Sequence, residues 1–566
     1  MKKFFSARTT AMILAAAILA AQASMSFAAV SSEGAVDVKK QVEDAISFPL
    51  KMQKSTGMGL VLGGPIEVTP KDDYYEVKLP SVSYSMEGIR ADFGTLVMNV
   101  TPSGDEYKTT LAIPETVNVY DAAKAPLAII KVGGQQFNGI WLPKYRSFTK
   151  IDAEYKDISI QSPKAGEKVA INVGSVKSTL ELTPDGNDIW SGPANFELTN
   201  LHMTAGDKGE VDFAIDSMKG SATYSKLNMQ TRKEMEEKTE QALAGITKDQ
   251  KPDPVQMQAM LNSIISSLQN YLDGMGSSFK MSGIHMKIHP GGEKGPEGKP
   301  EKPIDVNLSS VSWEFKMNGM QQEKGSVSFQ FGMDGLNVSN MDAGTASIVP
   351  TASNVEVHLD NLPIQELSKG LSGLFATVVN SAVASQGVTD TAQKTALQSQ
   401  IQAQVGAAML SIPAQLATAG SKLSIVNTYA KAPDVGSTLD GSFTANAASP
   451  VMAQGSVTLL ITGLDELILK LQTMGQGANP DPKLLGWAQG LGMLQMMGQL
   501  GKAPDGRTQR TYKLEVAADG KVMLNGADFS NAMQGMGGMG APQVGQPGPE
   551  GGAPKAPEDL EQEKTP

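Results

Sequence analysis

Four histidines, His202, His285, His289 and His358, are the side chains of this chain best suited to exchange protons near neutral pH. No nucleophile elbow of the G-x-S-x-G type and no H-E-x-x-H zinc motif accompanies them. The sequence therefore identifies no catalytic residue, and an enzyme, for example a hydrolase of envelope polymers, is the less favoured interpretation.

A metal site would need ligands that converge on one ion. His285 and His289 would be neighbours on a helix, but their surroundings alternate like a strand, where residues four apart stand about 13 Å from each other. Asp72 and Asp73 fit a solvated turn better than an acid–base pair. The segment Asp334-Gly335-Leu336-Asn337 lacks the alternating oxygen ligands and distal Glu of a calcium loop. We therefore predict no metal and no cofactor.

Thirty methionines are the remaining chemical signal. For the helical cluster Met493, Met496 and Met497 we favour packing in a core, with a ligand-facing apolar wall as the alternative. For Met533-Gln534-Gly535-Met536-Gly537-Gly538-Met539 we favour a disordered linker, with a weak copper(I) site as the alternative.

The first residues predict export. Lys2, Lys3 and Arg8 precede an apolar run over 11–21 that is too short to span a bilayer, and small residues at Ser26 and Ala28 suit cleavage. We predict a signal peptide over 1–28, a periplasmic protein, and no transmembrane helix after cleavage. The chain contains no cysteine, so a packed core must stabilise it without disulfides.

The net charge of −11 argues against nucleic acid as a partner. The Lys-rich stretches 226–238 and 280–302 are interleaved with glutamates, so no basic patch compensates.

Three cycles of strands and helices organise the mature chain. Val38, Val42, Ala45 and Ile46 predict an amphipathic helix that ends at Pro49. Alternating segments between 57 and 224 then predict an antiparallel meander, with turns at Pro102-Ser103-Gly104 and Pro184-Asp185-Gly186.

The second cycle is predicted as a helical pair over 231–247 and 254–272, strands over 278–289 and 304–359, a loop over 290–303, and helices over 364–416. The third is predicted as strands over 423–428, 437–444 and 455–462, helices from 464 and over 482–500, and a final hairpin of strands 511–516 and 521–524. In the first of these helices the predicted buried stripe is Leu464, Leu467, Ile468 and Leu471. The second is predicted as a further apolar helix that carries Leu484, Trp487, Leu491, Leu494 and Met497.

We thus predict an α+β fold in which long antiparallel β-meander sheets alternate with helical hairpins. The predicted units are a signal peptide (1–28), an N-terminal helix and meander (29–224), a middle unit (225–420), a C-terminal β-α-α-β unit (421–533) and a disordered tail (534–566).

The pattern Gly455-Ser-Val-Thr-Leu-Leu-Ile-Thr-Gly463-Leu-Asp-Glu-Leu, followed by two apolar helices and Ala518-Asp519-Gly520-Lys-Val-Met-Leu-Asn525-Gly526, resembles the C-terminal region of the DUF2125 and DUF945 (YdgA-like) bacterial envelope proteins. The resemblance implies an envelope location, but no activity and no site residues.

Together these features favour an exported, non-enzymatic envelope protein that binds a lipid or another hydrophobic ligand in a sheet-lined groove. The alternative is a structural or chaperone-like protein whose acidic tail, 550–563, contacts an envelope partner. The sequence names no ligand-binding residues.

Overall fold

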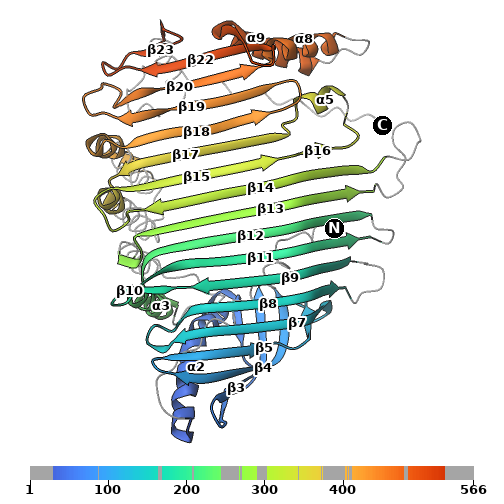
Figure 1. Cartoon of the computed structure of the whole chain (residues 1–566), viewed down its shortest axis with the longest axis vertical. Coiled ribbons are helices and arrows are strands. Elements are labelled where there is room, and N and C mark those ends of the chain that lie inside the picture. The colour runs from blue at the N-terminus through green and yellow to red at the C-terminus, as the bar shows by residue number, and fades with distance from the viewer. Residues whose placement is uncertain are drawn as a thin grey trace, which may run out of the picture.

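One long antiparallel sheet of 24 strands dominates the computed structural model. The structure describes residues 30–529, except 87, 163–168, 207–209, 244–266, 268–269, 290–301, 342, 477–481 and most of 371–410. Consecutive long strands pair with each other, so the chain climbs from one end of the sheet to the other (Figure 1). The predicted β-rich meander is confirmed, although it forms one sheet where several were expected.

The N-terminal part of the sheet contains the following strands: β1 (Gly59–Val61), β2 (Glu67–Pro70), β3 (Tyr75–Met86), β4 (Ile89–Ser103), β5 (Glu106–Ala112), β6 (Thr116–Tyr120), β7 (Pro126–Leu142), β8 (Ser147–Gln161), β9 (Val169–Glu181), β10 (Thr183–Gly186), β11 (Ile189–Ala205) and β12 (Val211–Asn228). The short helix η1 (Pro143–Tyr145) connects β7 to β8. The predicted turn at Gly104 joins β4 to β5 with a φ of +66°, which glycine adopts without strain.

The sheet continues with β13 (Gly274–Ile288), β14 (Ile304–Asn318), β15 (Gly325–Asp334), β16 (Asn337–Val338), β17 (Ala352–Leu362), β18 (Lys422–Lys431), β19 (Gly436–Ala445), β20 (Ala453–Thr462), β21 (Gln499–Lys502), β22 (Thr508–Val516), β23 (Val522–Leu524) and β24 (Ala527–Asp528). Pairing is unbroken at residues 224 and 420, where the sequence predicted unit boundaries, because β12 pairs with β13 and β17 with β18. The predicted hairpin of β22 and β23 is confirmed.

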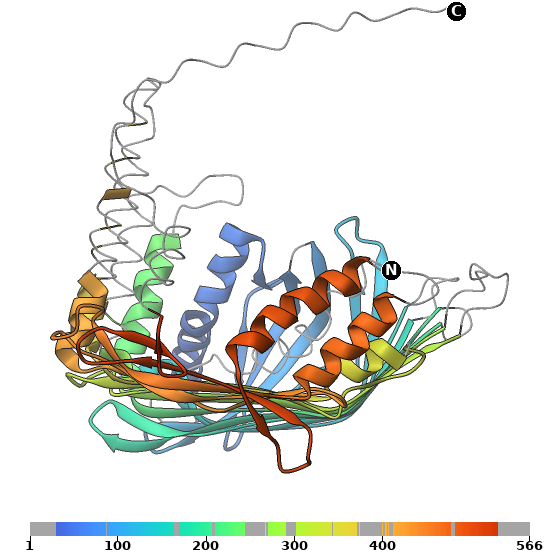
Figure 2. The same ribbon diagram turned by 90° about the horizontal axis from the view of Figure 1, so that it is seen from above.

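The helices lie on one side of this sheet. Figure 2 shows the sheet as an arc whose concave side holds α2 (Ser32–Thr56), α3 (Met229–Leu243), α8 (Leu464–Gly475) and α9 (Pro482–Met497). A short helix, α5 (Ala343–Ile348), joins β16 to β17.

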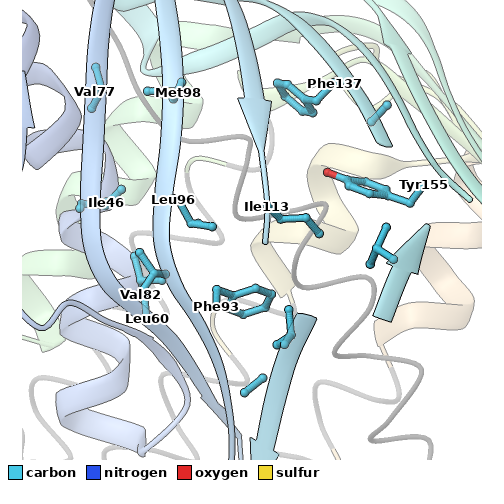
Figure 3. Close-up of a cluster of buried hydrophobic side chains, with 14 of the residues drawn as sticks. Ile46, Leu60, Val77, Val82, Phe93, Leu96, Met98, Ile113, Phe137 and Tyr155 are labelled. Atoms are coloured by element: carbon cyan, nitrogen blue, oxygen red, sulfur yellow. The ribbon is translucent and has the colours of Figure 1, made fainter. Parts of the chain in front are cut away.

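Helix α2 covers the N-terminal third of the concave face. Ser31 caps its first turn by accepting the amide of Gly34 at 2.9 Å. The predicted stripe of Val38, Val42, Ala45 and Ile46 is buried as expected, in one core cluster with strands β1 to β11 (Figure 3). The predicted end at Pro49 is wrong: the helix continues to Thr56 and ends at Gly57, whose φ of +77° gives the usual left-handed cap.

A line of unpaired residues crosses the sheet from β7 to β14 and changes the phase of side-chain alternation. Pairing skips one residue in each strand, and these residues are Gly133, Asp157, Gly174, Asn200, Asp216, Gly283 and Ser309. Asp157, Asn200 and Gly283 have positive φ values of 50°, 52° and 63°. We call these positions the switch line.

The effect of the switch line is visible in burial. Tyr155 and Ile158 on β8 are both buried in the core cluster although they are three residues apart, and so are Val173 and Val176 on β9. Strict alternation would place the members of each pair on opposite faces. Because neighbouring strands change phase at the same place, their apolar residues stay on the concave side.

Several predicted segments lie outside the described residues: the signal peptide, nearly all of the second helix of the 231–272 pair, most of the 290–303 loop, most of the 364–416 helical region and the tail from 534.

Candidate functional site

The concave side of the middle strands carries apolar side chains in rows that cross the sheet. Directly paired residues of an antiparallel sheet share a face, so each row can be followed through the register. One row is Phe196, Gly220, Phe279, Trp313, Phe331 and Val355. The next row is Ala194, Ala222, Ser277, Phe315, Phe329, Val357, Ile425, Gly441, Val457 and Leu514.

Two further rows flank these. One is Val176, Leu198, Met218, Met281, Val311 and Met333. The other is Tyr224, Met275, Met317, Val327, Leu359, Leu423 and Phe443. We call these four rows, which together run from β9 to β22, the apolar face. It lies on the same side as α2, because Leu198 and Val176 belong to the core cluster that α2 completes.

The apolar face is buried at its N-terminal end and accessible in the middle. Leu198 is 1 % exposed, whereas Phe329, Phe331, Val355 and Leu359 are 43, 40, 41 and 37 % exposed. These four residues form one patch, since Phe331 pairs with Val355 and Val327, next to Phe329, pairs with Leu359. A contiguous accessible patch of large apolar side chains is more often a binding surface than a surface that meets only water.

The stretch of half-buried and exposed apolar side chains has the dimensions of an acyl chain. From β13 to β18 the five strands β13, β14, β15, β17 and β18 span about 19 Å at ~4.8 Å per strand. One leaflet of a bilayer contains about 15 Å of hydrocarbon. Phe279 and Trp313 lie along this stretch with ring centroids 6.5 Å apart. Gly220 lies opposite Phe279 in the register and presents no side chain of its own.

The convex side is polar. A row of Glu154, Lys177, Glu197, Lys219 and Lys280 crosses five strands, and the Lys219 Nζ lies 3.0 Å from the Glu197 carboxylate. The two faces of the middle strands therefore differ sharply, and only the concave one offers an apolar surface.

Helix α3 is fixed beside α2 by charged groups. Glu240 accepts hydrogen bonds from Ser47 and from Lys51, the latter at 2.8 Å, and Arg146 lies 3.6 Å from Glu237. Burial raises the pKa of the nearby Glu236 carboxyl, an effect that Arg232 at 3.7 Å opposes. This network anchors α3 beside α2, on the same side of the sheet as the apolar face.

A buried phenol marks the covered end of the apolar face. The Tyr155 hydroxyl, on β8, has no hydrogen-bond partner among the described residues, and burial raises its pKa to about 12. The group therefore stays protonated throughout the neutral range.

At the other end of the sheet α8 and α9 pack against each other. Leu467 and Leu471 of α8 are buried with Ala488 of α9, and Leu484 and Leu491 pack on them. The predicted buried stripe of α8, which also includes Leu464 and Ile468, is confirmed.

The predicted core packing of the α9 methionines is wrong. Trp487 is 66 % exposed, and Met493, Met496 and Met497 are 67, 79 and 46 % exposed, so the methionine cluster does not pack in a core. The helix is apolar on every side, and periodicity could not tell which side faces α8.

The histidines do not converge. The Nε2 atoms of His202, His285 and His358 lie 2.9, 2.9 and 2.8 Å from Asp212, Asp305 and Glu356, three separate carboxylates on the sheet. The backbone amide of His289, just after β13, donates to the Glu210 carbonyl at 2.7 Å.

Within the described ranges, no group of three or more His, Cys, Asp or Glu side chains is arranged to hold a metal ion. Asp72 and Asp73 are exposed in the turn before β3, and Gly335 takes a φ of +71° in the turn after β15. The same part of the chain contains no helix long and apolar enough to cross a membrane.

The apolar face was not predicted, although the alternation of aromatic and polar residues that indicates it is present in the sequence. Trp313 and Phe315 on β14 and Phe329 and Phe331 on β15 alternate with polar residues, which already puts the aromatic rings on one side of each strand. The registers that align the strands link segments too far apart in sequence to be inferred from alternation.

No protein-family model, curated protein or solved structure matches this chain. The resemblance to the DUF2125 and DUF945 proteins stays a prediction.

Proposed function

We propose that this protein is an exported, non-enzymatic protein of the bacterial envelope that binds the acyl chains of a lipid along the apolar face. The observation that carries the proposal is the accessible patch of Phe329, Phe331, Val355 and Leu359, which continues directly from a buried core.

The energetics support a ligand with extended hydrocarbon. Each methylene group that leaves water for an apolar surface contributes about 0.8 kcal/mol when it is fully buried. A chain that lies on an open face is covered on one side only, so about half of this value is a reasonable expectation. A chain of about sixteen carbons would then gain roughly 6 kcal/mol before its loss of motion is subtracted.

The site offers little to any reactive chemistry. The four rows contain one serine, Ser277, and no His, Asp or Glu, and the three paired histidines stand beside carboxylates elsewhere on the sheet. This composition suits holding a ligand rather than transforming it.

The test begins with the protein purified from the periplasm without detergent. Native mass spectrometry followed by solvent extraction should detect a lipid in stoichiometric amount. Phe329→Glu, which places a charge on the apolar face, should reduce the bound lipid at least tenfold.

The matched control is Ser328→Glu, one residue earlier on the same strand. Its side chain points to the convex side, where its cross-strand neighbours are Lys316 and His358. It adds the same charge and should leave the lipid in place. A protein that is empty when folded, or equal loss of lipid in both variants, would refute the proposal.

A further inference from the structure

Helix α9 presents an uncovered apolar surface at the C-terminal end of the sheet. Trp487, Met493 and Met496 are each about two thirds exposed or more, and Leu500, just beyond the helix, is 66 % exposed. The opposite side of α9 packs on α8 through Ala488 and Leu491. A helix that is apolar all round normally has apolar surroundings on every side.

The charge pattern of this segment is distinctive. Residues 484–501 contain no Asp, Glu, Lys or Arg, and Lys483 and Lys502 stand directly before and after this run. Tryptophan and lysine near the ends of an uncharged apolar segment are residue types that anchor such segments at a membrane–water interface.

The segment is held rigidly in place. The Tyr512 hydroxyl donates to the Leu494 carbonyl at 2.9 Å, Arg510 donates to the Gly498 carbonyl at 3.2 Å, and Asn525 donates to the Met497 carbonyl at 2.9 Å. These bonds tie the end of α9 to β22 and to the turn after β23, so its exposed side keeps a fixed orientation relative to the sheet.

Helix α9 and the apolar face lie on the same side of the sheet. Figures 1 and 2 show α8 and α9 on the concave side at the last strands. The row that passes through Phe329 and Phe315 reaches Val457 on β20 and Leu514 on β22, the strand to which α9 is tied. Apolar surface therefore continues from the middle of the sheet to the base of this helix.

We propose that α9 docks the protein on a phospholipid bilayer, lying parallel to the membrane with Trp487, Met493 and Met496 in the boundary between headgroups and acyl chains. Lys502 would meet anionic headgroups at the end of the run. Passage of lipid between the bilayer and the apolar face would rest on the proposed function, whereas docking itself does not.

A bilayer fits this surface better than a protein partner does. Protein interfaces surround their apolar centre with a polar rim that forms directed hydrogen bonds. Besides its exposed apolar side chains, the outer side of α9 carries Gly486, Gly490 and Gln489, and a Cβ added at either glycine would meet nothing within 4 Å. A fluid hydrocarbon surface requires no such rim.

The test uses the full exported chain and vesicles of phosphatidylcholine with a quarter phosphatidylglycerol. The protein should float with these vesicles, and bilayers with brominated acyl chains should quench Trp487 fluorescence. Quenching should persist in Trp313→Phe, which removes the tryptophan of the apolar face, and should disappear when Trp313→Phe and Trp487→Phe are combined.

A charge-matched pair of variants locates the contact. Met493→Glu with Met496→Glu should lower the floated fraction at least fivefold. Ser312→Glu with Ser424→Glu places two glutamates on the convex side and should float like the unaltered chain. If Met493→Glu with Met496→Glu misfolds, as judged by circular dichroism, the quenching measurement on the unaltered chain decides.

The two proposals fail separately. Protein that carries lipid but neither floats nor shows quenching would overturn docking and leave lipid binding standing. Protein that floats but contains no lipid would do the reverse. Dimers in solution that Met493→Glu disperses, without any vesicle binding, would show that a second copy of the chain covers α9 and would overturn docking.

Discussion

Substitution of Gly283 by alanine should be unusually costly, because this glycine meets two separate constraints on the switch line. Its φ is +63°, a region that costs an L-residue about 1–2 kcal/mol. A Cβ at this position would also lie 2.0 Å from Oδ2 and 2.8 Å from Cβ of Asp216 on the neighbouring strand. Overpacking of this kind typically costs a further ~1–3 kcal/mol. We expect Gly283→Ala to reduce the free energy of unfolding by about 2–5 kcal/mol.

Gly104 supplies the matched control. Its φ is +66°, and a Cβ there would meet no atom within 4 Å, so Gly104→Ala should cost only the backbone part, about 1–2 kcal/mol. Denaturant unfolding followed by circular dichroism measures both variants.

A second substitution on the neighbouring strand tests the cause. Asp216→Gly removes the Cβ that the new methyl group would strike, so combined with Gly283→Ala it should recover the steric part in a double-mutant cycle. Equal losses at Gly283 and Gly104, or no coupling with Asp216, would show that the switch line is not closely packed.

Three further predictions concern the core, the helix network and the C-terminal unit. Phe331→Ala should reduce the free energy of unfolding by less than half of the ~3–5 kcal/mol expected for Phe137→Ala, because Phe331 is 40 % exposed and Phe137 only 3 %. Thermal or denaturant unfolding measures both variants, and equal losses would mean that the apolar face is covered in solution. Burial raises the folded-state pKa of Glu236, so its contribution to stability is present below its unfolded pKa and is lost as pH rises through the folded pKa. Glu236→Gln should flatten this loss of stability in a pH series of melting temperatures. An unchanged slope would contradict the prediction. Hydrogen bonds from Arg510, at 3.0 and 2.8 Å, lower the pKa of Asp465. Asp465→Asn should therefore reduce the free energy of unfolding by about 1–3 kcal/mol at neutral pH, and by progressively less as pH falls through that lowered pKa. A loss of stability that does not depend on pH would point to packing instead.

Local patterns in the sequence predicted individual elements well. The stripe of α8 and the burial of Val38 and Val42 follow from spacing alone, because a helix with one apolar side has only one way to bury it. For helix α9, spacing alone does not predict the buried side. Its apolar residues surround the axis, so no spacing distinguishes the side that meets α8 from the side that carries Trp487.

The continuous sheet was harder to predict because its registers connect distant segments. β17 ends at Leu362 and its partner β18 begins at Lys422, and neither strand contains a signal for the other. The helix end predicted at Pro49 was wrong for a different reason. Proline disfavours a helix interior locally, but the packing of α2 on the strands extends to both sides of Pro49.

The switch line explains how apolar side chains can stay on the concave side along the full length of the strands that it crosses. Shifting the phase of one strand alone would move its apolar side chains to the convex side. Here each strand changes phase opposite its neighbour, as at Asn200 and Asp216 on β11 and β12, and at Asp216 and Gly283 on β12 and β13. Leu198 and Leu201 consequently both face the core cluster, three residues apart on one strand. Inserting a residue beside one switch position would break this match, and we infer that the apolar residues beyond the switch line, such as Leu201, stay on the concave side because of it.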